Sequence, residues 1–158
     1  MAITKTNAMR RLDAARIPYR VMEYTVDEND LSGTHIAEQI GLPYGQVFKT
    51  LVAKGDKTGP VVFCIPCDAE IDLKRAASLT GNKKIEMIHV KDLLALTGYI
   101  RGGVSPIGMK KKFPTCIDET AILFDTIDVS AGMRGAQILL NPQALADYIG
   151  AQFAELTV

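Results

Sequence analysis

A lysine in the middle of an apolar strand is the first candidate for a chemical role. Lys49 lies in the run Gln46–Lys54, which is rich in β-branched, aromatic and aliphatic residues and which Gly55 ends. Alternation places apolar residues on both faces of this strand, so we expect both faces to be buried. A cation there is costly unless its ammonium reaches solvent or meets an anion or a carbonyl. Lys49 therefore either extends along its stem to the surface or stands at the floor of a cleft, where it could bind an anionic or carbonyl ligand.

Two glycine-rich loops could supply hydrogen-bond donors. The segment Arg101–Gly108 contains three glycines and a proline, which excludes regular structure and predicts unusual backbone dihedrals. A second loop, Val129–Gly135, combines a serine, two glycines and an arginine. Each is either an ordinary tight connection or a nest of N–H groups that holds an oxyanion or a carbonyl. With an inward lysine, the loops describe a pocket with many donors and no strong base, suited to an ester or carboxyl group and to the ribose or phosphates beyond it.

The cysteines and histidines give little support for redox, metal or triad chemistry. Cys64 and Cys67 have the C-x-x-C spacing, but Cys64 lies in the apolar run Val61–Ile65 and not at a helix N-terminus, which indicates a core residue. The other possible zinc ligands have no ligand-like spacing: Cys116, His35 and His89. No G-x-S-x-G, H-E-x-x-H or P-loop motif is present. We expect neither a metal nor a cofactor.

Composition indicates one globular domain that spans residues 1–158, with 47% hydrophobic and 23% charged residues. The formal net charge of zero argues against a protein that binds DNA or RNA mainly by neutralising phosphates. A net charge of zero is still compatible with a protein that binds only the end of a nucleic acid. No run is long and apolar enough to span a membrane, and the N-terminus has no signal-peptide core. We expect a cytoplasmic protein whose odd number of cysteines are free thiols.

The elements that position these residues alternate irregularly. Helices are predicted over 4–16, 35–40, 71–81, 91–96 and 143–149, and strands over 19–24, 46–54, 61–65, 84–88, 115–118, 127–130 and 136–140. The strands 46–54 and 61–65 should form an antiparallel hairpin, and the tail from Gln152 could add a helical turn. Because there is no regular βαβ repeat, we expect an α+β fold: a mixed, mostly antiparallel, barrel-like sheet surrounded by helices.

Four motifs occur in the order and rough spacing of the YbaK family, which the chain resembles over nearly its whole length. They are Val47-Phe48-Lys49-Thr50-Leu51, Thr97-Gly98-Tyr99, Gly102-Gly103-Val104-Ser105-Pro106 and Ser130-Ala131-Gly132-Met133-Arg134-Gly135. The combination is specific, although each motif alone is not. The family includes free-standing trans-editing deacylases and the editing domain inserted in bacterial prolyl-tRNA synthetases. This chain resembles the free-standing Cys-tRNA(Pro) deacylases.

The resemblance implies an aminoacyl-tRNA deacylase that clears Cys-tRNA(Pro), with some action on Cys-tRNA(Cys). In this branch the thiol of the substrate cysteine attacks its own ester, tRNA leaves, and a cyclic thiolactone is released. The protein then supplies proximity and no nucleophile, base or metal. The implied partners are the 3′ end of tRNA(Pro) and, through recruitment, prolyl-tRNA synthetase.

The resemblance also assigns residues. Lys49 corresponds to the family's essential lysine and would orient the ester by holding the terminal ribose or phosphate, with Gly102 and Ser130 as the other catalytic candidates. Gly102 and Gly103 would hold the ester carbonyl with their amides. The substrate-binding candidates are Tyr24, Phe48, Gly103, Ser105, Pro106, Gly132 and Arg134. Where some relatives carry an aspartate, this chain has Gln137, which puts in question any role that requires a carboxylate there.

Three alternatives remain open. The chain could deacylate another small amino acid, such as alanine on tRNA(Pro), or it could bind a nucleotide or tRNA end without chemistry. A redox role would require the thiols of Cys64 and Cys67. The basic residues available for the tRNA body are few: Arg10, Arg11, Arg16 and Lys110 to Lys112.

Overall fold

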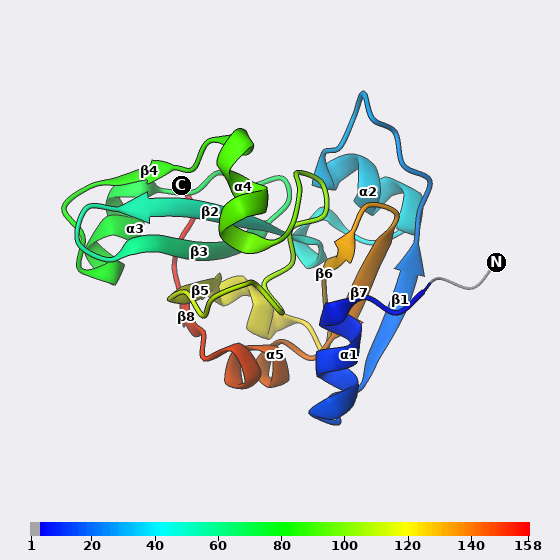
Figure 1. Ribbon diagram of the computed structural model, residues 1–158. Coiled ribbons are helices and arrows are strands. Elements are labelled where there is room, and N and C mark those ends of the chain that lie inside the picture. The colour runs from blue at the N-terminus through cyan, green and yellow to red at the C-terminus, as the bar shows by residue number, and fades with distance from the viewer. Residues whose placement is uncertain (1–3) are drawn as a thin grey trace.

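The computed structural model describes residues 4–158, which form two β-sheets with helices around them (Figure 1). The helices are α1 (Asn7–Ala14), α2 (Gly33–Ile40), α3 (Leu73–Thr80), α4 (Val90–Thr97) and α5 (Pro142–Ile149), with short 3-10 helices at Tyr44–Gln46 and Glu119–Leu123. The strands are β1 (Tyr19–Glu23), β2 (Phe48–Gly55), β3 (Gly59–Pro66), β4 (Ile85–Met87), β5 (Thr115–Asp118), β6 (Ile127–Met133), β7 (Ala136–Leu140) and β8 (Gln152–Ala154). None of the described helices is long and apolar enough to span a membrane.

The helix boundaries follow from local capping chemistry. Side chains of Thr6, Ser32, Asp72 and Asn141 each accept a backbone N–H three residues further on and so begin α1, α2, α3 and α5. Four helices end at a glycine in the left-handed region: Gly41, Gly81, Gly98 and Gly150. These caps explain why every helix predicted from the sequence is present with ends displaced by only a few residues.

The strands form a smaller and a larger sheet, which Figure 1 shows side by side. The smaller sheet is antiparallel with the order β1-β7-β6, and the larger has the order β4-β2-β3-β5-β8. The hairpin β2-β3 is confirmed, whereas β3, β5 and β8 run parallel to one another. A single parallel bridge, between Val47 and Asp128, joins the two sheets in the described residues.

Two expectations about the fold are corrected. The mixed α and β fold is confirmed, but residues 4–158 contain no closed barrel, because that bridge is the only strand pairing between the two sheets among these residues. The tail is a strand and not a helical turn: β8 pairs with β5, and Phe153 packs against the core. Pairing satisfies the backbone of this segment and extends the larger sheet at its edge.

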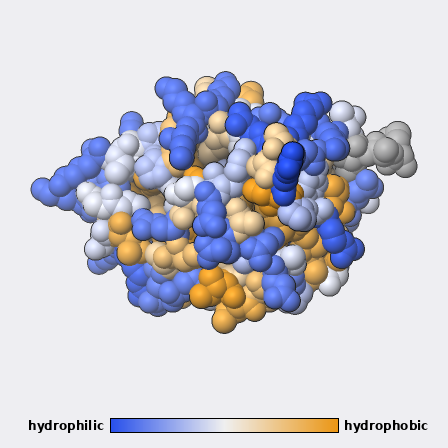
Figure 2. Space-filling model, turned by 90° about the horizontal axis from the view of Figure 1, so that it is seen from below, coloured by the Kyte–Doolittle hydropathy of each residue, from blue (hydrophilic) through white to orange (hydrophobic). Residues whose placement is uncertain are grey.

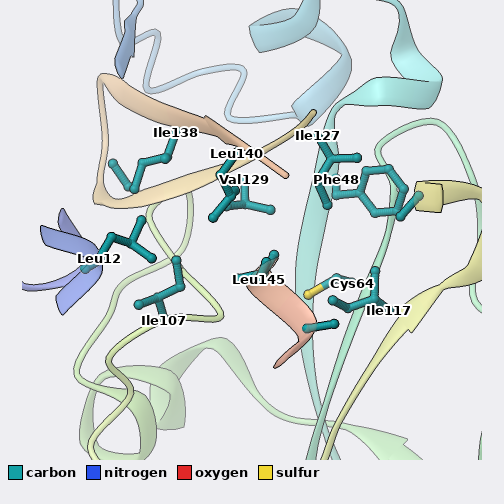
Figure 3. Packing of buried hydrophobic residues seen from close by; sticks show 14 of the residues in the cluster. Leu12, Phe48, Cys64, Ile107, Ile117, Ile127, Val129, Ile138, Leu140 and Leu145 are labelled. Carbon is teal, nitrogen blue, oxygen red and sulfur yellow. The ribbon is translucent and has the colours of Figure 1, made fainter. Parts of the chain in front are cut away.

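The main core lies between the two sheets. Figure 3 shows side chains from α1, both sheets and α5 converging, among them Leu12, Phe48, Ile138 and Leu145, which are all nearly inaccessible to solvent. A second cluster on the other face of the larger sheet packs Leu51, Ala53 and their neighbours against α3. The strand that carries Lys49 is therefore covered on both faces, as its composition predicts. Outside these clusters, hydrophilic residues dominate the face seen in Figure 2, with smaller apolar patches between them.

Candidate active site

A cavity of about 410 Å³ opens where the outer edge of β2 has no neighbouring strand. Just before β2, Val47 pairs with Asp128 of β6. At the end of β2, only residues 53–55 pair with β4. Between these two neighbours, Phe48 to Val52 line the cavity. Its other walls come from the start of α2, the β4–α4 segment and the first glycine-rich loop. The interrupted sheet edge is thus the structural origin of the cavity.

The cavity brings together the three catalytic candidates. Lys49, Gly102 and Ser130 all line it, and so does Phe48. Lys49 is only partly exposed, and its ammonium forms no ion pair with the carboxylates of residues 4–158. A half-buried cation without a counter-charge favours an anionic or strongly polar ligand.

The two glycine-rich loops pack directly against each other. The Arg134 Nε donates to the carbonyl of Arg101 at 2.9 Å. Gly102 has a φ of 87°, a conformation that residues with a Cβ rarely adopt, and a Cβ at Gly103 would stand 3.1 Å from the carbonyl carbon of Met133. The glycines therefore permit a close approach between the loops, and this approach places Gly102 on the cavity wall.

Several residues that the sequence assigns to substrate binding lie outside this cavity. The N–H of Gly103 donates to the carbonyl of Ile100 at 2.9 Å, and the N–H of Gly132 donates to Ser130 Oγ at 3.1 Å. Both amides are therefore engaged within their own loops, so the expectation that Gly103 donates to the ester carbonyl does not fit this geometry. The candidates that do not line the cavity are Tyr24, Gly103, Ser105, Pro106, Gly132 and Arg134.

The positions of these residues indicate that they support the loops and do not contact a ligand in the cavity. Arg134 ties the loops together, as described above. Ser105 is fully buried, and its Oγ accepts from the N–H of Ile107 at 3.2 Å. The N–H of Tyr24 donates to the carbonyl of Gly135, at the outer end of the second loop. Pro106 lines a different hollow, which is described below.

Other wall residues were not predicted from the sequence. The start of α2 contributes Ser32 and Gly33, and apolar side chains of the wall include Ile36, Ile88, Val90 and Leu93. Cys67 and Gln137 also line the cavity. A serine followed by glycine before an apolar helical stripe marks a helix start, but it does not reveal that the start faces Lys49. Gln137 was noted only as a departure from relatives.

The cysteines do not form a redox pair in this structure. Cys64 packs in the main core, whereas Cys67 packs in a third cluster with Val47 and Ala37, and all three cysteines are free thiols. Burial raises the pKa of Cys64 to about 12 and that of Cys67 to about 11. Such thiols are not the low-pKa thiolates of redox centres. Among residues 4–158, no three His, Cys, Asp or Glu side chains gather as metal ligands.

A buried carboxyl group lies behind the cavity wall. Asp128 is completely inaccessible to solvent, and its Oδ1 has no hydrogen-bond partner in residues 4–158. Burial raises its pKa to about 8. Both Lys49 and Asp128 act on the pKa of the Cys67 thiol, in opposite directions, so these charges lie in one neighbourhood.

This carboxyl group should make stability depend on pH. Its folded pKa of about 8 exceeds the ordinary value of 3.8, so the folded state holds the proton more tightly. Its contribution to stability is complete below the ordinary pKa and is lost as pH rises toward the folded pKa. Between about pH 5 and about pH 8, wild-type protein should lose on the order of 4 kcal/mol more stability than Asp128→Asn. Urea denaturation across this range measures the difference; parallel pH profiles would contradict it.

Comparison with known proteins gives consistent matches. A family model described as an aminoacyl-tRNA editing domain matches residues 32–148. A protein of Enterococcus faecalis, provisionally named Cys-tRNA(Pro)/Cys-tRNA(Cys) deacylase EbsC, is 54% identical over 97% of this chain and 93% of its own length. A proline–tRNA ligase of Lactobacillus delbrueckii subsp. bulgaricus is 26% identical over 78% of this chain, which covers 22% of the ligase.

Solved structures agree with the sequence matches. A crystal structure provisionally described as a trans-editing enzyme for prolyl-tRNA synthetase superposes with a TM-score of 0.81 at 25% identity, covering 98% of this chain and 99% of that one. The two proteins therefore share their fold over the full chain.

Proposed function

The chain belongs to the aminoacyl-tRNA editing domain family, and from this premise we propose that it removes cysteine from Cys-tRNA(Pro), and from Cys-tRNA(Cys), by cleaving the aminoacyl ester in the cytoplasm. The observation that supports this most is the cavity itself. A half-buried lysine, a glycine-rich wall and a serine hydroxyl meet in it, and the described residues place no nucleophile–base pair beside them.

Each of these groups has a role in the proposal. The Lys49 ammonium binds the terminal ribose or phosphate of the tRNA and orients the ester. The N–H of Gly102 donates to the ester carbonyl, where negative charge develops. Ser130 Oγ accepts from Gly132, so its own proton is available to donate to the substrate.

The chemical step is an intramolecular transfer. The substrate's cysteine sulfur attacks the ester carbonyl carbon, a C–S bond forms, and the bond from that carbon to the ribose oxygen breaks. The thiol proton passes to the ribose oxygen, so the products are tRNA with a free hydroxyl and a cyclic thiolactone. The protein lowers the barrier by holding sulfur and carbonyl in reacting geometry, which can contribute several kcal/mol.

Release of tRNA tests the proposal. The protein, incubated with radiolabelled Cys-tRNA(Pro), should release free tRNA faster than spontaneous hydrolysis does, and a panel of other aminoacyl-tRNAs defines the amino-acid preference. Faster turnover of alanyl-tRNA would support the alternative substrate. Binding without turnover of any aminoacyl-tRNA would support a binding module instead.

A second hollow supplies positive charge for the tRNA body. It has a volume of about 360 Å³ and is lined by Arg11 of α1 and by Lys110, Lys111 and Lys112. Among residues 4–158, no acidic side chain lies in its wall. We call it the basic hollow; Arg10 and Arg16 do not line it. One segment connects the two sites: Arg101, Gly102 and Val104 line the cavity, and Pro106 and residues 108–113 line the basic hollow. A tRNA end in the cavity can therefore place backbone phosphates in the basic hollow.

Removing charge from the basic hollow should weaken substrate binding without changing chemistry. Lys111→Ala, Lys112→Ala is expected to raise KM several-fold with kcat nearly unchanged, and to flatten the salt dependence of kcat/KM, because fewer counterions are released. The matched control is Lys57→Ala, Lys74→Ala, which removes two exposed lysines far from either site in sequence. Equal effects of the two double variants would contradict a specific role. Because the formal net charge is zero, we propose that prolyl-tRNA synthetase helps to deliver the substrate.

A further inference from the structure

The strands β6 and β7 present a polar surface toward the cavity. On β6, Ile127 and Val129 pack in the main core, so Asp128 and Ser130 lie on the opposite face. On β7, Ile138 packs in the same core, and Gln137 is directly opposite Ser130 in the register. Asp128, Ser130 and Gln137 therefore share one face, and Ser130 and Gln137 reach the cavity wall.

The hydrogen bonds of Gln137 determine how its amide is oriented. Its nitrogen donates to Asp128 Oδ2 at 2.6 Å and to the carbonyl of Val129 at 3.2 Å. In the opposite orientation the amide oxygen would face only acceptors. Both N–H groups are thus used by Asp128 and by the backbone, and the amide oxygen is turned away from them. Gln137 is only 4% exposed, so this orientation is held by buried partners.

The cavity therefore has two chemically different ends. Lys49 supplies a cation, whereas Gln137 supplies an oxygen that can only accept, with a buried carboxyl group behind it. An aminoacyl ester on a tRNA end also has two ends, an anionic nucleotide and a cationic α-ammonium group. Because the ammonium is repelled by Lys49 and can donate to the Gln137 amide oxygen at the other end, electrostatics favour one orientation of the substrate.

We propose that Gln137, oriented by the buried Asp128, binds the α-ammonium group of the aminoacyl substrate. This inference rests on the proposed function. Asp128 acts through Gln137: its carboxyl group holds the amide so that the oxygen faces the ligand. Gln137 is thus a specificity residue that distinguishes an aminoacyl ester from an acyl ester without an amino group, and Asp128 is a positioning residue.

Stable substrate analogues test this without relying on turnover. The first is 3′-cysteinylamido-3′-deoxyadenosine, and the second is its 3-mercaptopropionyl counterpart, which keeps the thiol and lacks only the amino group. Calorimetry with wild-type protein should give about 10- to 100-fold tighter binding of the first, the value of a hydrogen bond to a charged group. Gln137→Leu should reduce this ratio to near one, by weakening the first analogue alone.

Two further variants separate recognition from structure. Asp128→Asn should lower the ratio, because an asparagine no longer enforces one orientation of the Gln137 amide. The exchange variant Asp128→Asn, Gln137→Glu keeps one carboxyl group and one amide, places the carboxylate at the cavity, and should restore the ratio. A thermal melt of each variant shows that it is folded.

The outcomes are distinct. Equal affinities of wild-type protein for the two analogues, no binding of either, or equal weakening of both by Gln137→Leu would overturn the inference. Deacylation of Cys-tRNA(Pro) is measured in parallel and tests the proposed function by itself. A tenfold preference for the cysteinyl analogue without deacylation would reject the proposed activity and keep the ammonium site. Deacylation with equal affinities for the two analogues would keep the proposed activity and reject the ammonium site.

Discussion

Replacing Lys49 with alanine should reduce deacylation of Cys-tRNA(Pro) by at least about 100-fold, the cost of losing one group that stabilises charge in a closed site. The ammonium is half-buried at the cavity and has no counter-charge from residues 4–158, so its interaction free energy is available to the substrate. Because alanine also removes an unpaired cation from between two apolar clusters, the fold should be retained or become slightly more stable. Single-turnover kinetics and circular dichroism measure the two effects.

A lysine on the same strand provides the control. Lys54 is exposed, does not line the cavity and lies opposite Glu86 in the register of β2 and β4. Lys54→Ala should therefore keep nearly full activity. Lys49→Arg keeps the charge but changes its shape, and partial activity would separate charge from geometry. Rates of Lys49→Ala within twofold of wild type would remove Lys49 from the mechanism.

Alanyl-tRNA(Pro) should be deacylated at least about 100-fold more slowly than Cys-tRNA(Pro), because alanine has no thiol to attack the ester and loses the proximity advantage of an intramolecular nucleophile. The described lining of the cavity contains one thiol, that of Cys67, and burial raises its pKa to about 11, so it is a poor replacement for the substrate thiol. The comparison requires the same tRNA charged with each amino acid and assayed at equal concentrations.

Seryl-tRNA(Pro) is the matched control, since serine differs from cysteine only by oxygen in place of sulfur. It should bind comparably and react slowly, because a hydroxyl is a weaker nucleophile than a thiol near neutral pH. Detection of the thiolactone by mass spectrometry identifies the product directly. Equal rates for the alanyl and cysteinyl substrates would reject substrate assistance and favour attack by water.

Local patterns in the sequence were sufficient for the elements of the fold. The caps at Ser32 and Asp72, the αL glycines at Gly41 and Gly81, and the alternation in β2 depend on neighbours within a few residues, so composition and spacing predict them. The tail was misjudged because β8 is three residues long and exists only through pairing with β5, which is distant in the chain.

The sequence by itself determined that a lysine stands in a strand buried on both faces and that two glycine-rich loops interrupt regular structure, because both properties follow from residue type and local order. Only the tertiary structure decided which groups meet. The gap along β2, the engagement of the Gly103 amide by Ile100, and the contact between Asp128 and Gln137 arise from pairing across the sheets and turns. A hydrogen bond that orients an amide depends on distances between residues on different strands, and no spacing in the sequence records those distances.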